Sequence, residues 1–164
     1  MNKSNLKSYA PQARKDFIAA VTARANLLGL SETAGTLEVA PAQTQGDVTV
    51  IAGQAWPAKV SGQRDKLIER IRKDGFAHTM EAVAYTWFNR FAALRYMELH
   101  DYLGHGHRAL SSTSGGLPDI LTHATDLTSE LPGLNAAKVT ELKLAGNRDG
   151  ELYRMLLVAQ CNAL

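Results

Sequence analysis

The sequence predicts a mainly α-helical fold: a helical bundle around a central helix at about residues 77–103, with a small β-hairpin insertion at about residues 36–60. Three observations predict it. One long segment carries a broad apolar arc of helical period, its flanking segments carry helix start and stop residues, and residues 31–60 alternate between apolar and polar side chains. The 164 residues, 45% of them hydrophobic, suit one domain spanning residues 1–164 that buries its own core.

The N-terminal segment has the pattern of an amphipathic helix. Pro11 suits the first position of a helix, because the N–H that proline lacks would have no partner there, and Gly29 suits the end. Phe17, Val21 and Leu28 fall on one face between them. We therefore expect a first helix that begins at Pro11 and ends before Gly29.

The next segment changes to short strands. "TLEVA" and "DVTVIA" alternate as half-buried strands do, and Gly53-Gln54 is expected to form a hairpin turn. Pro57 cannot donate a ladder hydrogen bond, which confines the last strand to a sheet edge. Trp56 is expected to be a packing residue. Ser61 is then expected to cap a helix that ends at Gly75.

The central helix includes "AYTWFNRFAALRYMELHDYL", residues 84–103. At about 100° per residue its apolar side chains cover an arc of roughly 220°, more than double the stripe of a surface helix. The arc consists of Met80, Val83, Ala84, Tyr85, Trp87, Phe88, Phe91, Ala92, Leu94, Tyr96, Leu99, Tyr102 and Leu103. We expect this helix to pack against several neighbours, with Trp87 and Phe91 in the core, and to expose only its polar edge.

The remaining elements are a loop and three helices. Glycines and serines predict a loop over residues 104–118, and a short helix is expected after Pro118. Asn135 is expected to cap a helix that runs to about Ala145. "DGELYRMLLVAQCNAL" is still apolar and helical at its end, with no stop residue and no polar tail, so we expect the sequence to be the front part of a longer polypeptide.

Charge and targeting signals exclude several classes of protein. The net charge is only +2, with 11 Lys/Arg and 7 Asp/Glu through Asp74 and 7 and 9 after it, so strong autonomous binding to nucleic acid is not expected. The central segment is interrupted too often to reach the roughly 18 apolar residues of a membrane span. The single Cys161 and the absence of a secretory signal favour a soluble, cytoplasmic protein.

A basic stripe is the best electrostatic patch in the sequence. Lys66, Arg70 and Lys73 recur at i, i+4 and i+7 on one helix face. Asp65 and Glu69 partly neutralise them, and Glu69 can pair with Lys73. A solvated charged face is therefore the commoner interpretation, and a track for DNA phosphates is the functional one.

Four polar residues of the central helix are candidates of two kinds. Arg95 and Glu98 lie inside the apolar arc three residues apart, where an ion pair that fixes the packing of neighbouring helices is favoured over a functional site. Asn89 and Arg90 lie on the polar edge. They are candidates for contact with a phosphate or a partner, although a solvated edge is the commoner outcome.

The histidines offer the one cluster with metal-binding side chains: His100, His105 and His107, with Asp101 between them. Two of these histidines lie in a glycine-rich loop, with no second pair at a set distance as zinc-binding motifs have. We therefore expect a solvated loop and no metal site.

Several catalytic motifs are absent from the sequence. No glycine-rich turn joins a strand to a helix, no Gly-x-Ser-x-Gly elbow occurs, and Cys161 lies on an apolar helix without an evident base. The sequence therefore predicts no catalytic, cofactor-binding or metal-binding residue in this chain. The residues left as candidates for contact with DNA or a partner are Lys66, Arg70, Lys73, Asn89 and Arg90.

Three stretches together resemble the N-terminal region of the PglX family: "LKSYAPQARKDFIAAVTARANLLGL", "EAVAYTWFNRFAALRYMELHDYL" and "LPGLNAAKVTELKLAGNRDGELYRMLLVAQCNAL". PglX proteins are the adenine-specific DNA methyltransferases of BREX phage-defence systems. The resemblance implies methyl transfer from S-adenosylmethionine to the exocyclic amine of adenine in duplex DNA, in company with other BREX proteins. Such enzymes flip the adenine out of the duplex and hold it with an Asn/Asp-Pro-Pro-Tyr/Phe motif.

That motif is missing from this sequence, because its prolines, at positions 11, 41, 57, 118 and 132, are never adjacent. We therefore expect the catalytic domain beyond residue 164, and a docking role for this segment on that domain, with DNA or with other BREX proteins. A free-standing helical interaction module without enzymatic linkage is the alternative.

Overall fold

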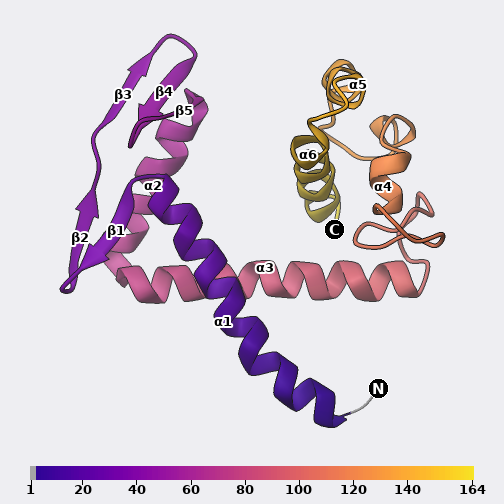
Figure 1. Cartoon of the computed structure of the whole chain (residues 1–164), viewed down its shortest axis with the longest axis horizontal. Helices are drawn as coiled ribbons and strands as arrows, with labels where there is room; N and C mark the ends of the chain where they lie inside the picture. Colours follow the sequence, from indigo (N-terminus) through magenta and orange to yellow (C-terminus); the bar gives the residue numbers. More distant parts are fainter. Residues whose placement is uncertain (1–2) are drawn as a thin grey trace. The chain divides into compact units, whose positions relative to one another are not determined.

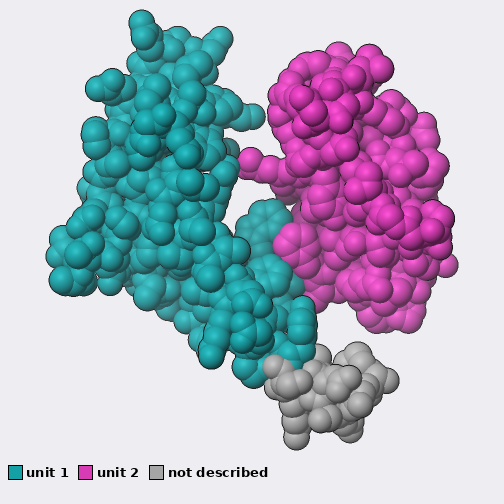
Figure 2. Space-filling model, in the orientation of Figure 1, with its two compact units in different colours: residues 1–88 teal, residues 89–164 magenta. Residues whose placement is uncertain are grey.

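The computed structural model describes residues 3–164, with side chains from Tyr9 onward. In that part of the chain, six α-helices, one 3-10 helix and five short strands follow one another (Figure 1). They divide between two compact units, residues 1–88 and residues 89–164 (Figure 2). The predicted mainly helical class with a small β region is confirmed. The arrangement as a bundle around one helix, and the single domain over residues 1–164, stay predictions.

The first unit begins with α1 (Lys3–Leu27). Two antiparallel sheets follow: β1 (Leu30–Thr33) with β2 (Thr36–Val39), and then β3 (Ala42–Gln45), β4 (Val48–Ile51) and β5 (Gln54–Pro57) in that spatial order. Helices α2 (Lys59–Asp74) and α3 (Phe76–Leu99) come next, and α3 continues into the second unit.

Two tight turns set the register of the strands. Ala34-Gly35 joins β1 to β2 with φ of +50° and +77°, and Ala52-Gly53 joins β4 to β5 with φ of +49° and +78°. Two residues with positive φ give a turn whose twist matches that of antiparallel strands. The turn predicted at Gly53-Gln54 is therefore wrong by one residue, because an alanine here takes a left-handed conformation that alanine seldom adopts.

The β region is larger than the predicted single hairpin. The sequence pattern did not predict β1 and β3. Strand β3 is exposed along its whole length and so carries no alternation of apolar residues. The prediction for Pro57 is confirmed: it ends β5, which lies at an edge of its sheet opposite Val48.

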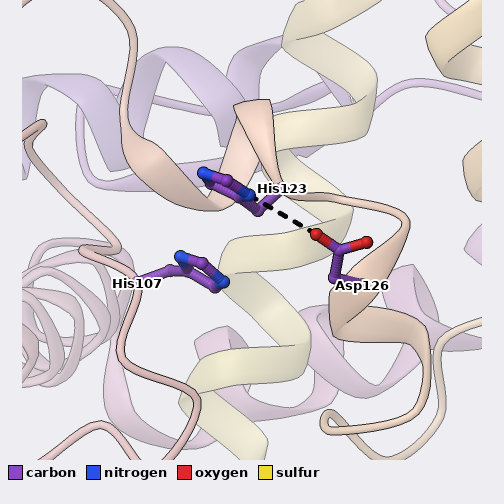
Figure 3. Close-up of side chains that lie close together, drawn as sticks. All are labelled: His107, His123 and Asp126. Atoms are coloured by element: carbon purple, nitrogen blue, oxygen red, sulfur yellow. Dashed lines mark hydrogen bonds and ion pairs between the residues drawn. The ribbon is translucent and has the colours of Figure 1, made fainter.

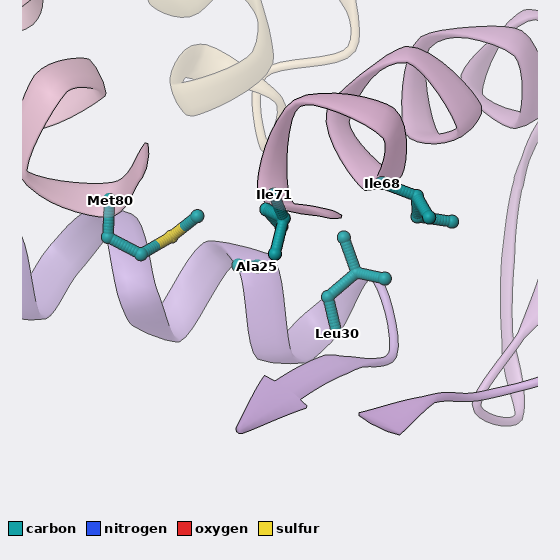
Figure 4. Packing of buried hydrophobic residues seen from close by; sticks show 5 residues of the cluster. All are labelled: Ala25, Leu30, Ile68, Ile71 and Met80. Carbon is teal, nitrogen blue, oxygen red and sulfur yellow. The ribbon is translucent and has the colours of Figure 1, made fainter. Parts of the chain in front are cut away.

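The core of the first unit joins three helices to the first strand (Figure 4). It consists of Ala25, Leu30, Ile68, Ile71 and Met80, which come from α1, β1, α2 and α3. Because each of these four elements contributes only one or two of the buried side chains, the four elements form this core together.

A buried arginine connects the sheets to α2. Arg64 is 4% exposed; its Nε donates to the Leu28 carbonyl at 2.7 Å, and its Nη2 donates to the Ala40 carbonyl. The two carbonyls lie after the end of α1 and after β2. A buried guanidinium is tolerated when carbonyl oxygens accept its hydrogen bonds, so Arg64 orients the β region on α2.

The second unit contains the C-terminal part of α3, a loop, α4 (Asp119–Thr122), the 3-10 helix η1 (Asp126–Thr128), α5 (Ala136–Leu144) and α6 (Asp149–Asn162). Helices α4 and α5 both pack against α6. The largest side chains buried completely here are Leu94, Glu98, Ile120, Leu127, Val139, Leu142, Leu152 and Leu156. The predicted cap at Asn135 is confirmed, since its side chain accepts the Lys138 N–H at 3.0 Å.

Two predicted helix starts are wrong. Pro11 lies inside α1, which begins at Lys3, so the preceding residues continue the helix although proline removes one hydrogen bond. Ser61 lies inside α2, whose N-cap is Ala58 and which has no side-chain cap. The predicted stop at Gly75 is confirmed by its φ of +86° and its N–H bond to the Ile71 carbonyl at 2.8 Å.

The central helix is shorter and less buried than predicted. Asp101 has a φ of +54°, and the Tyr102 N–H bonds back to the Met97 carbonyl at 2.8 Å, so α3 ends in a left-handed cap without any glycine. Tyr85 and Tyr96, placed in the packed arc, are 67% and 56% exposed. The expectation that only the polar edge is exposed is therefore wrong, because tyrosine hydroxyls let these rings remain in water.

The same correction applies to the aromatic residues expected in the core. Trp87 and Phe91 are only partly buried, whereas the buried positions of α3 include Met80, Ala84 and Leu94. Helix α3 thus buries a stripe narrower than its apolar arc.

Candidate functional sites

The basic stripe lies on the exposed face of α2. Lys66, Arg70 and Lys73 are exposed, while Ile68 and Ile71 on the opposite face are buried. The nearest counter-charge differs from the prediction: Arg70 Nε lies 3.7 Å from Asp74 Oδ2, and no Glu69–Lys73 ion pair forms in the described structure. A surface pair of this kind contributes little to stability, so all three cations remain accessible to an anion.

Asn89 and Arg90 belong to the second unit, whereas the basic stripe belongs to the first. Asn89 is exposed and Arg90 is partly buried.

Burial raises the pKa of the Cys161 thiol, and the positive charge of Arg90 opposes that shift only in part. Cys161 therefore stays protonated at neutral pH and is unsuited to nucleophilic attack.

Arg95 and Glu98 form the predicted ion pair, and they fasten a loop. The buried Glu98 carboxylate accepts the Leu110 N–H at 2.8 Å and the Ser111 hydroxyl at 3.0 Å, besides its contact with Arg95 Nη1. Burial by itself raises the pKa of Glu98, but the bonds from Leu110, Arg95 and Ser111 outweigh it and hold that pKa below its ordinary value. The pair thus holds the loop of residues 104–118 against α3.

A histidine cluster forms where that loop meets the segment between α4 and η1. The rings of His107 and His123 stack with centroids 4.1 Å apart and planes 9° apart, and His123 Nδ1 lies 3.4 Å from Asp126 Oδ2 (Figure 3). One ligand atom from each of the three residues lies within 4.8 Å of the others. A polar cavity of about 420 Å³ adjoins the two rings and is also lined by Asp119 and Thr122.

The neighbouring histidine is held by both of its ring nitrogens. His105 Nδ1 accepts the His107 N–H at 3.1 Å, so its Nε2 carries the proton and donates to Oε1 of the buried Gln160 at 2.6 Å. Burial, then the nearby His123 and His105, lower the pKa of His107. The expectation of a merely solvated loop is therefore wrong for His105 and His107.

An apolar groove of about 480 Å³ lies between α1 and α3 in the first unit. Phe17 and Phe88 pack edge to face at its wall, with ring centroids 5.7 Å apart, and Tyr85 is exposed beside them. The Arg14–Glu81 ion pair lies at its border. Of these three rings only Tyr85 is exposed, and Phe17 and Phe88 are partly buried. An apolar groove bordered by an exposed aromatic side chain is typical of surfaces that contact another molecule.

No protein-family model matches this chain. Curated relatives do match, and each match covers the whole chain. The adenine-specific methyltransferase BrxX of Escherichia coli O9:H4 (strain HS) is 44% identical over 167 residues, and the adenine-specific methyltransferase PglX of Lacticaseibacillus casei (strain Zhang) is 28% identical over 178 residues.

By sequence, the chain matches one segment of the BrxX and PglX methyltransferases. The resemblance to PglX inferred from three stretches of sequence is thereby confirmed. The chain spans only 14% of the length of BrxX and 15% of that of PglX. Because the match covers so small a part of these relatives, the activity of a whole methyltransferase remains a proposal for this chain.

The structure adds residues to the candidates for this BrxX/PglX segment. Sequence spacing grouped His100, His105 and His107, whereas the structure joins His107 to His123 and Asp126. His100 instead stacks on Tyr102 and makes a tilted ring contact with Tyr96. The i, i+3 spacing of His123 and Asp126 was the one available signal, and it lies in a segment expected only to be a short helix.

The structure also bears on the membrane question. Over residues 3–164, none of the helices has both the length and the apolar character needed to cross a membrane.

Proposed function

We propose that this chain is the N-terminal, non-catalytic domain of an adenine-specific DNA methyltransferase of a BREX defence system. The observation that supports this most is the 44% identity to BrxX across the whole chain. The complete enzyme would work in the cytoplasm. It would transfer a methyl group from S-adenosylmethionine to the exocyclic amine of an adenine flipped out of duplex DNA.

We further propose that this segment docks on the catalytic domain, with DNA and other BREX proteins as additional partners. The apolar groove that contains Phe17, Tyr85 and Phe88 supports a protein contact, because it is too apolar to be a typical solvated surface. The exposed basic stripe on α2 supports a contact with phosphates, because lysine and arginine side chains bind phosphate oxygens. Asn89 and Arg90, in the second unit, are separate candidates for such a contact.

The first experiment reads the gene past codon 164 and assays the product. We expect the frame to continue to an Asn-Pro-Pro-Tyr-like motif, and the full-length protein to methylate adenine in duplex DNA with labelled S-adenosylmethionine. A stop codon at this position would instead favour the free-standing interaction module. A full-length protein without adenine methylation on host DNA would contradict the proposed activity.

The second experiment tests docking. The 164-residue chain and the remainder of the enzyme are produced separately, and their association is measured by analytical ultracentrifugation. We expect a 1:1 complex that the double substitution Phe17→Ser and Tyr85→Ser weakens. The matched control is Tyr9→Ser with Tyr102→Ser, at exposed tyrosines outside the groove. Equal association of the groove variant and the parent would show that docking uses another surface.

A further inference from the structure

We propose that His107, His123 and Asp126 form a binding site for one divalent transition-metal ion, best matched by Zn²⁺. This inference is independent of the methyltransferase proposal. Two imidazole nitrogens, one carboxylate oxygen and one water make a four-coordinate set of the kind that Zn²⁺ accepts. His107 lies 16 residues before His123 and 19 residues before Asp126, so only the folded second unit brings the three side chains together.

The backbone around these side chains is held in place before any ion binds. Asp126 N–H bonds to the His123 carbonyl at 3.0 Å, and Ala124 and Leu127 are completely buried, which fixes the turn that carries both ligands. On the facing loop, the His105 ring accepts the His107 N–H. Supporting bonds of this kind orient the side chains that bind a metal.

His105 is a positioning residue and not a ligand. Its two ring nitrogens are both engaged, one by the His107 N–H and one by the buried Gln160 side chain. His123, in contrast, has Nδ1 toward Asp126 Oδ2 and its Nε2 at the other side of the ring (Figure 3). The Asp126 carboxylate therefore lies beside the His123 ring, where both side chains can bind the same ion.

The rings must turn to bind. An ion lies in the plane of each imidazole that holds it, and the planes of His107 and His123 are now nearly parallel, 9° apart. Tetrahedral ligands about 2.0–2.2 Å from Zn²⁺ lie roughly 3.4 Å apart. The atoms that now lie within 4.8 Å must therefore approach one another. The torsion between Cβ and the ring is broad in energy, so this rotation costs little.

The ion has a route to the site. The His123 and Asp126 side chains are 44% and 67% exposed, and the cavity of about 420 Å³ beside the rings gives space for the ion and its remaining water. Binding would tie the loop of residues 104–118 to the segment between α4 and η1. The site is thus expected to stabilise the second unit and not to perform chemistry.

Titration calorimetry of the metal-free 164-residue chain with ZnCl₂ tests this site. We expect one Zn²⁺ per chain, a higher melting temperature with the ion, and at least about tenfold weaker binding in His107→Ala and in His123→Ala. Asp126→Asn should weaken binding as well. His100→Ala is the matched control, since it removes an exposed imidazole of the same unit outside the cluster, and it should bind as the parent does.

The parent chain supplies a measurement that does not depend on folded variants. Addition of Zn²⁺ should shift the imidazole ¹⁵N resonances of His107 and His123 and leave those of His78 unchanged. Co²⁺ should give visible d–d bands that Zn²⁺ displaces. The proposal is overturned if the parent binds no Zn²⁺, if the two imidazole resonances do not move, or if the His107→Ala/His123→Ala double variant binds as tightly as the parent.

Discussion

Glu98 shows how one buried carboxylate can fix a loop. It accepts hydrogen bonds from Leu110, Ser111 and Arg95, and its side chain is inaccessible to water. Each bond favours the charged form, and together they outweigh the cost of burial. The loop of residues 104–118, which has no regular secondary structure, therefore owes part of its conformation to a side chain of α3.

We predict that Glu98→Gln lowers the free energy of unfolding at pH 7 by about 1–3 kcal/mol, because glutamine replaces charge-assisted hydrogen bonds with weaker ones. The folded-state pKa of Glu98 lies below its ordinary value of 4.5. The stability contributed by its charge is thus present above that value and is lost as the pH falls through the folded-state pKa. Urea unfolding at several pH values measures this difference.

The free energies of unfolding of the parent chain and of Glu98→Gln should therefore converge as the pH falls below 4.5. The carboxylates that they share, such as Asp119 and Glu141, also have lowered pKa values, but their contributions cancel in the comparison. Burial and the Glu98 charge raise the pKa of Tyr153 above its ordinary value, so its hydroxyl stays protonated throughout this range. A gap that stays constant from pH 7 to pH 3 would contradict this account.

Gly29 shows a second constraint on a single residue. Its φ is +67°, and a Cβ at this position would lie 2.6 Å from Ala40 Cβ. The two residues are also joined by a hydrogen bond, in which the Ala40 N–H donates to the Gly29 carbonyl at 2.8 Å. A side chain would thus meet both backbone strain and a collision with the chain that follows β2.

We predict that Gly29→Ala destabilises the protein by about 1–3 kcal/mol or more, measured by urea unfolding. Gly35→Ala is the matched control: its φ of +77° imposes similar backbone strain, but a Cβ there has no atom within 4 Å. The control should lose less stability. Equal losses would mean that the approach of Ala40 to Gly29 is not limiting.

Helix α2 has two faces with different roles. Ile68, Ile71 and the buried Arg64 hold it to the β region and to α1, while Lys66, Arg70 and Lys73 are exposed. Because the packing face contributes none of the three cations, they can be replaced without removing a core side chain.

We predict that the chain binds duplex DNA weakly and without sequence preference, and that glutamine at Lys66, Arg70 and Lys73 abolishes this binding. Each phosphate contact releases counterions, so three contacts give a log-log salt slope of about −3. The slope is measured by fluorescence anisotropy between low and moderate salt. The substituted chain should show a flat response and an unchanged melting temperature.

The control for this experiment removes the same charge elsewhere. Lys15, Lys138 and Arg154, none of them on α2, are replaced together with glutamine. If this control loses as much affinity as the stripe variant, the binding reflects net charge alone. If the parent chain binds no DNA at low salt, the exposed face of α2 is a solvated surface.

At the scale of the whole molecule, the sequence lacks the motifs that adenine methyltransferases are expected to carry. Its matched relatives are methyltransferases of roughly seven times its length, as the 14% coverage of BrxX indicates. We predict that the 164-residue chain alone does not methylate adenine, because the sequence has no adjacent prolines and no glycine-rich turn between a strand and a helix. Incubation with labelled S-adenosylmethionine and duplex DNA, with the full-length protein as the positive control, measures this. Labelled adenine above background would contradict it.

Local signals in the sequence were sufficient for most elements of the molecule. Helix stops at Gly29 and Gly75, the Asn135 cap and the edge position of Pro57 follow from the geometry of single residues, which does not depend on distant partners. The Arg95–Glu98 pair follows from i, i+3 spacing on a helix. These features were predicted because their causes lie within a few residues.

Only the tertiary structure decided which side chains meet across long stretches of chain. The junction of His107 with His123 and Asp126, the carbonyl partners of Arg64 and the loop contacts of Glu98 join residues 12 to 36 positions apart. The end of α3 at Asp101 and the exposure of Tyr85 and Tyr96 also escaped the periodicity. A helical wheel gives the direction in which a side chain points, but burial depends on whether another element packs there, and periodicity within one helix carries no information about that.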